Sequence, residues 1–191
     1  MIMKIPSSWL VILYDIPPKP SRLKVRLWRD FKRMGAVYPF MSMCIVPNTN
    51  ENSRELERIS KMIVTNGKLL RIRGRAFNKN DQGNILEIFR AERDKQYDEI
   101  LEECHEFIDE IKLNINNKKT TQEEVEEMEE ALNGLRRWYD RVKSLDWVKK
   151  TTAATKIEKS LEKCEEIMTK FSHLSHPKQR IPEYKPELLR D

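Results

Sequence analysis

The Pro17-Pro18 pair divides an apolar run from an amphipathic one, and this break constrains the fold more than any other feature of the chain. Residues 9–14 are β-branched, aromatic or leucine, which is typical of a strand, and proline cannot extend a strand ladder. The strand is therefore expected to end at Asp15. Ser21 is a suitable helix N-cap, and the apolar residues after it recur at helical spacing until Gly35. The opening predicts a strand, a tight turn and an amphipathic helix.

Extended and helical patterns alternate up to residue 77. Residues 36–47 are predicted to be extended and broken at Pro39, as two short strands or a hairpin, and residues 48–52 to form a polar turn. A second helix follows and ends at Asn66-Gly67, and residues 69–77 alternate as a strand. The order β-α-β-β-α-β is the ferredoxin-like arrangement. In that fold both helices cover one face of the sheet, which leaves the other face for a partner or a dimer mate.

Residues 80–172 differ in composition and pattern, with only Gly83 and Gly134 as helix breakers and with apolar residues at heptad spacing. They predict a first helix over about 81–116, a second that starts near a capping box at Thr121, and a third. The expected heptad positions are Tyr97, Ile100, Cys104, Phe107 and Ile111 in the first helix, Val125, Met128, Leu132, Leu135, Tyr139 and Val142 in the second, and Ile157, Leu161, Cys164, Met168 and Phe171 in the third.

The predicted fold class is therefore α+β, with three parts. Residues 1–79 are expected to form a basic ferredoxin-like βαββαβ module. Residues 80–172 should form a long antiparallel helical hairpin with a third helix packed on it. The proline-containing residues 173–191 are expected to be an extended or disordered tail.

Charge is distributed unevenly between these parts. Residues 1–79 hold 16 Lys and Arg against five Asp and Glu, a net +11, whereas the remainder has a net charge of −6. The predicted first helix presents four arginines at steps of four, three and four, with Lys32 beside them, and the last strand adds three more. The candidate anion-binding residues are Arg22, Arg26, Arg29, Lys32, Arg33, Arg71, Arg73 and Arg75. They indicate either a solvated basic surface or a contact surface for the phosphates of a nucleic acid.

Several functional classes are disfavoured by the sequence. Charged residues make up 35% of the chain, and no apolar run approaches the roughly 20 residues that a bilayer span needs. The N-terminus has too short an apolar stretch for a secretory signal. The three cysteines are far apart, which indicates neither a disulfide framework nor a CxxC metal site. We therefore expect a cytoplasmic protein without a membrane partner.

Asp15 is the one weak candidate for a catalytic residue. It follows the first strand, and a symmetric dimer would supply two copies of it to a metal such as magnesium. The alternative is that Asp15 ends the strand and binds turn amides. His173 and His176 lie too near the terminus to indicate a site, and no Ser-His-Asp order, Gly-rich phosphate loop or HExxH motif is present. No metal site and no cofactor are expected.

Several segments resemble the N-terminal domain of ChrB, the chromate-resistance regulatory protein. The resemblance covers roughly residues 8–170 and is carried by residues 9–14, 17–21, 25–29, 32–37, 46–47, 89–94, 101–104 and 135–138. It implies a DNA-binding, chromate-responsive regulator of an operon with a chromate efflux transporter. Relatives with the same opening topology, the middle domain of the phenylacetate-pathway repressor and the small CRISPR integration protein, imply a ferredoxin-like fold and a dimer, and Asp15 matches the metal-linked aspartate of the latter. The chain ends where ChrB continues into a domain linked to chromate sensing, so that domain or a separate sensing protein is a candidate partner.

The sequence thus predicts a DNA-binding regulator that acts as a homodimer, with chromate or another oxyanion as a candidate effector among the arginines of the first helix. One alternative is a metal-dependent nuclease, or an inactive descendant of one, that uses Asp15. Another is a scaffold whose helical region binds a partner protein.

Overall fold

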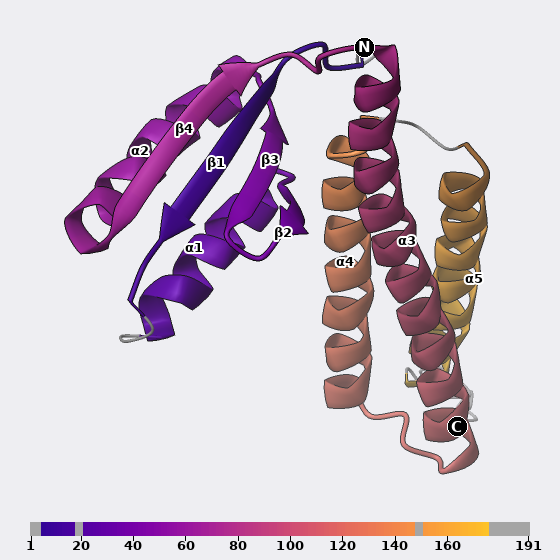
Figure 1. Cartoon of the computed structure of the whole chain (residues 1–191). Coiled ribbons are helices and arrows are strands. Elements are labelled where there is room, and N and C mark those ends of the chain that lie inside the picture. The colour runs from indigo at the N-terminus through magenta and orange to yellow at the C-terminus, as the bar shows by residue number, and fades with distance from the viewer. Residues whose placement is uncertain (1–4, 18–20, 148–150, 176–191) are drawn as a thin grey trace, which may run out of the picture. The chain divides into compact units, whose positions relative to one another are not determined.

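A computed structural model describes residues 5–17, 21–147 and 151–175 (Figure 1). The N-terminal part follows the predicted order β-α-β-β-α-β. Its elements are β1 (Trp9–Asp15), α1 (Ser21–Arg33), β2 (Val37–Phe40), β3 (Met43–Pro47), α2 (Asn50–Asn66) and β4 (Lys68–Gly74). Three further helices follow, α3 (Lys79–Asn116), α4 (Gln122–Ser144) and α5 (Thr151–Ser175).

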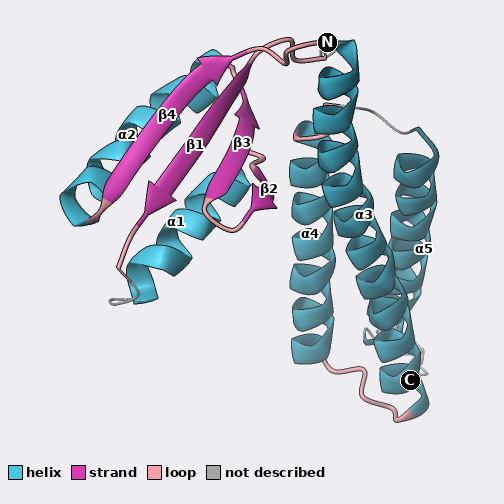
Figure 2. Cartoon of the chain, in the orientation of Figure 1, coloured by secondary structure: helices cyan, strands magenta, loops and turns pink. Residues whose placement is uncertain are grey.

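The four strands form one antiparallel sheet in the order β2-β3-β1-β4 (Figure 2). Two β-α-β units are interleaved, because each places a strand of the other between its own two strands. The register puts Leu13 of β1 opposite Met43 of β3 and Leu70 of β4. The strand β4 therefore forms one free edge of the sheet, and β2 forms the other.

The main core lies between the sheet and the helices α1 and α2, which cover the same face (Figure 1). Side chains at alternate positions of β1 and β3 point into it because successive strand residues face opposite sides. Its fully buried members include Ile12, Cys44, Leu27, Phe31, Ile59 and Ile63. Cys44 thus packs as a small hydrophobe, as the sequence predicts.

The opposite face of the sheet is covered in part by α3. Trp9 of β1 stacks on Phe89 of α3 with ring centroids 5.1 Å apart, and its indole Nε1 donates a hydrogen bond to Gln82 Oε1 at 3.0 Å. Ile45 and Val37 complete this second core. The face that was expected to be left for a partner or a dimer mate is therefore partly occupied at this end by the first turns of α3.

The turn at Gly35 shows why α1 ends where it does. Gly35 follows α1 with a φ of 76°, the amide of Gly35 donates to the Lys32 carbonyl, and the next amide donates to the Phe31 carbonyl. A Cβ at Gly35 would lie 3.0 Å from Leu145 Cδ2. This position therefore needs glycine both for its left-handed backbone and for the close approach of the chain beyond α4.

Three details of the predicted boundaries are wrong. The last strand of the sheet ends at Gly74 and not at residue 77. The break between the second and third strands falls at residues 41–42, and Pro39 lies inside β2, an edge strand on which a proline costs no ladder hydrogen bond on its open side. The polar turn before α2 is shorter than expected, because Thr49 caps the helix by accepting from the amide of Asn52 and the helix begins at Asn50.

The helices α3, α4 and α5 bury every predicted heptad position. Thr121 caps α4 by accepting a hydrogen bond from the amide of Glu124 at 3.3 Å, as its capping box predicts. The helix α5 continues to Ser175, so His173 is helical and not part of a tail. His176 and residues 177–191 lie outside the described residues.

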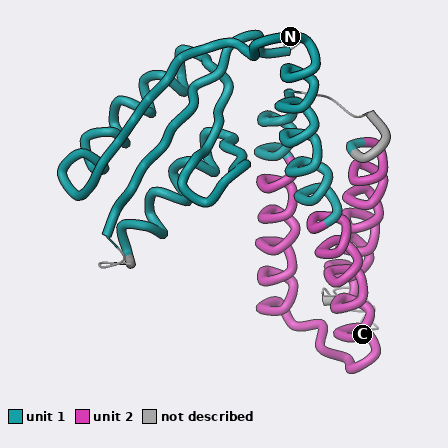
Figure 3. Tube along the Cα trace, viewed as in Figure 1, with its two compact units in different colours: residues 1–98, 140–154 teal, residues 99–139, 155–191 magenta. Residues whose placement is uncertain are grey.

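The chain divides into two compact units (Figure 3). The first holds residues 1–98 and 140–154. It therefore combines the sheet with α1 and α2, which we call the sheet module, with the first half of α3 and the end of α4. The second, which we call the helical unit, holds residues 99–139 and 155–191. Within it, Cys164 Sγ lies 3.5 Å from the carbonyl oxygen of Cys104. Among the described residues, none of the helices combines the length and apolarity that crossing a bilayer requires.

Candidate nucleic-acid interface

The helix α1 presents its arginines on one flank. Its buried apolar residues, Leu27 and Phe31, define the side that packs on the sheet. At 100° per residue, Arg22, Arg26, Arg29 and Arg33 fall within a narrow sector well away from that side, and all four are exposed. We call these four residues the arginine stripe.

The stripe is anchored at its C-terminal end by a buried carboxylate. Asp30 is only 3% exposed, and its two carboxylate oxygens face Arg33 Nη2 at 3.4 Å and Arg58 Nη2 of α2 at 3.1 Å. Arg58 also binds Glu55. Hydrogen bonds to Glu55 and then Asp30 raise the pKa of Arg58, and the same bond from Arg58 lowers the pKa of Glu55. This network joins α1 to α2 and neutralises one end of the stripe.

The other three arginines of the stripe are available to an external anion. Arg22, Arg26 and Arg29 are exposed and have no ion-pair or hydrogen-bond partner among the described residues. From Arg22 to Arg29 the helix rises by about 10 Å at 1.5 Å per residue. Because phosphates of one DNA strand follow at about 3.4 Å along the axis, this length corresponds to about three of them.

Lys32 lies outside the stripe and has an internal role. It is half-buried, forms an ion pair with Glu92 of α3, and lies 5.9 Å from the ring centroid of Trp28 and 6.0 Å from that of Tyr38. Cation–π contacts of this kind favour a fixed ammonium group. The structure thus places Lys32 at the contact of α1 with α3, apart from the arginines that precede it.

The arginines of β4 lie at the free edge of the sheet. Arg71 and Arg73 stand opposite Ile12 and Leu10 in the register, so they project on the side of the sheet that α2 covers. Arg71 binds Glu57 Oε1 at 2.7 Å and Ser60 Oγ at 3.2 Å. Arg75, beyond the end of β4, is exposed.

A hollow of about 590 Å³ adjoins this edge. Its lining combines Arg54 of α2 with Arg71 and Arg73, and the remaining lining residues are Leu10, Ser53, Leu56, Glu57 and Ile72. The sequence reasoning missed Arg54, although its position on the outer side of α2, beside a basic strand, was a usable signal. The basic residues of the module therefore form two groups, the stripe on α1 and this edge.

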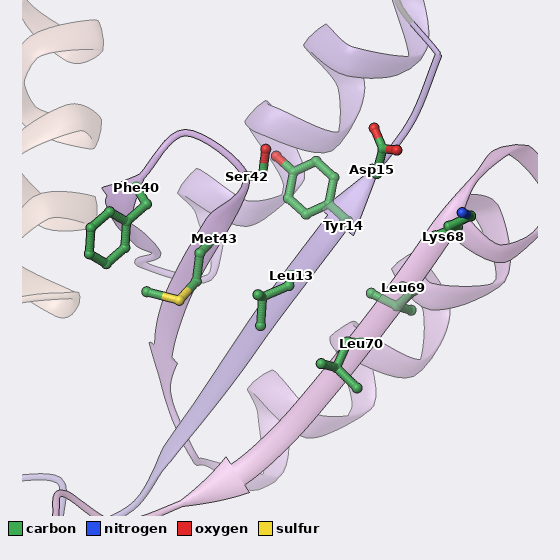
Figure 4. A pocket seen from close by; sticks show the side chains of 9 residues that line it. All are labelled: Leu13, Tyr14, Asp15, Phe40, Ser42, Met43, Lys68, Leu69 and Leu70. Carbon is green, nitrogen blue, oxygen red and sulfur yellow. The ribbon is translucent and has the colours of Figure 1, made fainter.

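Asp15 lies at the rim of an apolar hollow on the open sheet face (Figure 4). It is exposed and stands opposite Lys68 of β4 in the register. The hollow measures about 490 Å³, and its remaining lining residues are Leu13, Tyr14, Phe40, Ser42, Met43, Leu69 and Leu70. In the described part of the chain, no three His, Cys, Asp or Glu side chains come close enough together to hold a metal ion.

The comparisons with known proteins agree with the resemblance seen in the sequence. Residues 24–180 match the family model described as Protein ChrB, N-terminal. No curated protein and no solved structure matches the chain significantly.

Proposed function

The chain belongs to the family of ChrB N-terminal domains, which suggests a part in regulating chromate resistance, and on this basis we propose that it is a DNA-binding transcriptional regulator. The observation that carries the proposal is the exposed and unpartnered set Arg22, Arg26 and Arg29 on one flank of α1. Arginine offers a planar fork of donors that matches phosphate oxygens. A stripe of this kind supplies affinity for the DNA backbone and little choice of sequence.

The fold supports this proposal. The order β2-β3-β1-β4, with two interleaved β-α-β units and both helices on one face, is what a ferredoxin-like module requires, and we assign the N-terminal part to that fold. Its open face keeps Leu70, Ile72 and Phe40 about half exposed or more, beside the apolar hollow. Apolar strips of this kind mark interaction surfaces. We propose that a second copy covers this strip, which gives a cytoplasmic homodimer with two arginine stripes.

The test is a titration of fluorescent DNA from upstream of the protein's own operon at several salt concentrations. We expect the wild-type affinity to fall steeply with salt, and the triple change of Arg22, Arg26 and Arg29 to Ala to flatten the slope of log K against log salt by about 2 to 3 for each stripe that contacts the DNA. A matched control changes Lys112, Arg136 and Arg137 of the helical unit, which are exposed and paired with acids, to Ala.

Three outcomes distinguish the proposed DNA-binding surface from its alternatives. Loss of slope in the stripe variant alone supports the proposed surface. Equal binding by the wild type and the stripe variant means that another surface contacts DNA. If the wild type binds no DNA even at low salt, the regulator proposal fails and a protein-binding scaffold becomes the better interpretation.

A further inference from the structure

The strand β4 leaves one side of its backbone unpaired at the edge of the sheet (Figure 2). It pairs with β1 from Lys68 to Gly74, and no other described strand lies beside it. The position of β1 in the sheet shows which backbone groups of β4 are unpaired. The amide of Tyr14 in β1 donates to the Ser42 carbonyl on the β3 side, and successive residues of a strand turn their backbone groups to opposite sides.

The odd-numbered residues of β1 therefore direct their amide and carbonyl groups to β4, where they meet the even-numbered residues of that strand. The hydrogen bond from Ser8 Oγ to the Gly74 carbonyl at 3.1 Å agrees with this assignment, because Ser8 lies at the β1 side of β4. The odd-numbered residues of β4 then direct their backbone groups outward, and they are Leu69, Arg71 and Arg73. Each offers one donor and one acceptor to an additional strand.

On the side of this edge that α2 covers, the side chains are basic. Arg71 and Arg73 of β4 line the hollow of about 590 Å³ together with Arg54 of α2. Arg71 is paired with Glu57. Arg54 and Arg73 are exposed and have no ion-pair or hydrogen-bond partner in the described part of the chain. This side of the edge therefore has two cations that an external carboxylate can bind.

On the open face of the sheet, the side chains of the same strand are apolar. Leu70 is 56% exposed and Ile72 is 48% exposed, and Leu70 also lines the hollow of about 490 Å³ (Figure 4). Directly opposite residues of two paired strands share a face. A strand added to β4 would therefore place alternate side chains beside the arginines and the others beside Leu70 and Ile72. The strand that fits this edge alternates acidic and apolar residues.

Neither a second copy of β4 nor a nucleic acid fits this edge as well as an acidic strand does. Antiparallel pairing along the whole of β4 would place the two copies of Arg71 directly opposite each other, and like charges in that position are destabilising. A nucleic acid would bind the arginines, but it has no row of amides to pair with the outward carbonyls of β4. A peptide strand that carries carboxylates satisfies both sets of groups.

We propose that the β4 edge is a docking site for an extended segment of a partner protein in which Asp or Glu alternates with Val, Ile or Leu. The segment adds a strand to the sheet through the outward backbone groups of residues 69–73, and its carboxylates bind Arg54 and Arg73. Its apolar side chains lie about 4.8 Å farther out than those of β4 and so extend the apolar strip without covering it. This site is separate from the arginine stripe and does not rest on the proposed DNA binding.

The test titrates the full-length chain into a fluorescent heptapeptide of alternating glutamate and valine and follows the fluorescence anisotropy. Two further peptides carry N-methyl groups, one on the glutamate amides and the other on the valine amides. An added strand turns only one of these two sets of amides toward β4. We expect methylation of that set to weaken binding by about tenfold or more, and methylation of the other set to leave the affinity nearly unchanged. These peptides test the strand pairing without any change to the protein.

A charge reversal in the protein tests which residues bind the carboxylates. Arg54→Glu combined with Arg73→Glu should fold, because both arginines are exposed and unpaired, and should prefer a peptide of alternating lysine and valine. Lys163→Glu combined with Lys170→Glu makes the same change of charge at two exposed positions of α5 and should keep the preference for the glutamate peptide.

Four results would overturn the proposal. The first is that the wild type does not bind the glutamate peptide at about 1 mM. The second is equal weakening by the two methylations, which means that binding needs no strand pairing. The third is an equal loss of binding in the two charge-reversed proteins, which means that only net charge matters. The fourth is that the Arg54 and Arg73 variant flattens the salt dependence of DNA binding while no peptide binds, because the edge would then contact nucleic acid.

Discussion

The buried carboxylate of Asp30 gives a prediction in which stability and DNA binding move in opposite directions. Asp30→Asn keeps the shape of the side chain and removes the charge that holds Arg33 and Arg58. Hydrogen bonds to charged groups contribute about 1.5–3 kcal/mol when buried, but the two arginine side chains are 64% and 45% exposed, so the loss is discounted. We expect the free energy of unfolding to fall by about 1–2 kcal/mol.

The same substitution should strengthen the response of DNA binding to salt. Arg58 remains bound to Glu55, so Arg33 is the cation that becomes available at the end of the stripe. One additional phosphate contact steepens the slope of log K against log salt by about 0.9. The substituted protein should therefore bind more tightly than the wild type at low salt, although it is less stable.

Chemical denaturation and the DNA titration described above measure these two effects. Asp109→Asn is the matched control, because it adds the same charge at an exposed aspartate that is paired with Lys112 on α3. The reasoning is refuted if Asp30→Asn leaves stability unchanged, or if it weakens DNA binding without a change in slope. The second result would mean that the ion pairs of Asp30 maintain the conformation of α1 and do not neutralise the end of the arginine stripe.

Two further predictions concern the sheet module. Gly67→Ala should lower the free energy of unfolding by at least 2 kcal/mol, because a Cβ there would lie 2.1 Å from the Asp15 carbonyl oxygen, and urea denaturation against Gly83→Ala, where the space is open, checks it. Burial raises the pKa of the Cys44 thiol from 9.0 to about 12, so the stability that this thiol contributes is complete below pH 9 and lost between pH 9 and 12. The difference in unfolding free energy between the wild type and Cys44→Ala should shrink over that range. A constant difference would show that burial does not raise the pKa of the Cys44 thiol.

Local sequence patterns predicted a helix or strand well where the burial of one of its faces determines its structure. The heptad positions of α3, such as Ile100 and Cys104, are buried because a repeat of three and four residues returns to the same side of a helix. Gly35 ends α1 because no other residue takes its backbone conformation at low cost. The element order needed nothing beyond these local signals.

Contacts between distant residues could not be predicted in this way. Arg58 lies 28 positions after the aspartate that it binds, and Lys32 is 60 positions from Glu92, so no local period shows either pair. The sequence therefore placed Lys32 with the stripe, whereas the structure directs it to α3. The burial of Arg93, which is only 2% exposed, was also missed, because the pattern of a glutamate-rich helix predicts a surface arginine at this position.

The distribution of charge explains why the stripe suits a polyanion better than other basic positions do. The lysines and arginines of the helical unit are interspersed with a larger number of acids, and Arg136 and Arg137 are each paired with a glutamate. An approaching phosphate chain meets no net attraction there. In the sheet module, basic residues exceed acidic ones threefold, and Asp30 and Glu55 are already committed to arginines. On the proposed function, long-range attraction would therefore direct a nucleic acid to the end of the chain that carries Arg22, Arg26 and Arg29.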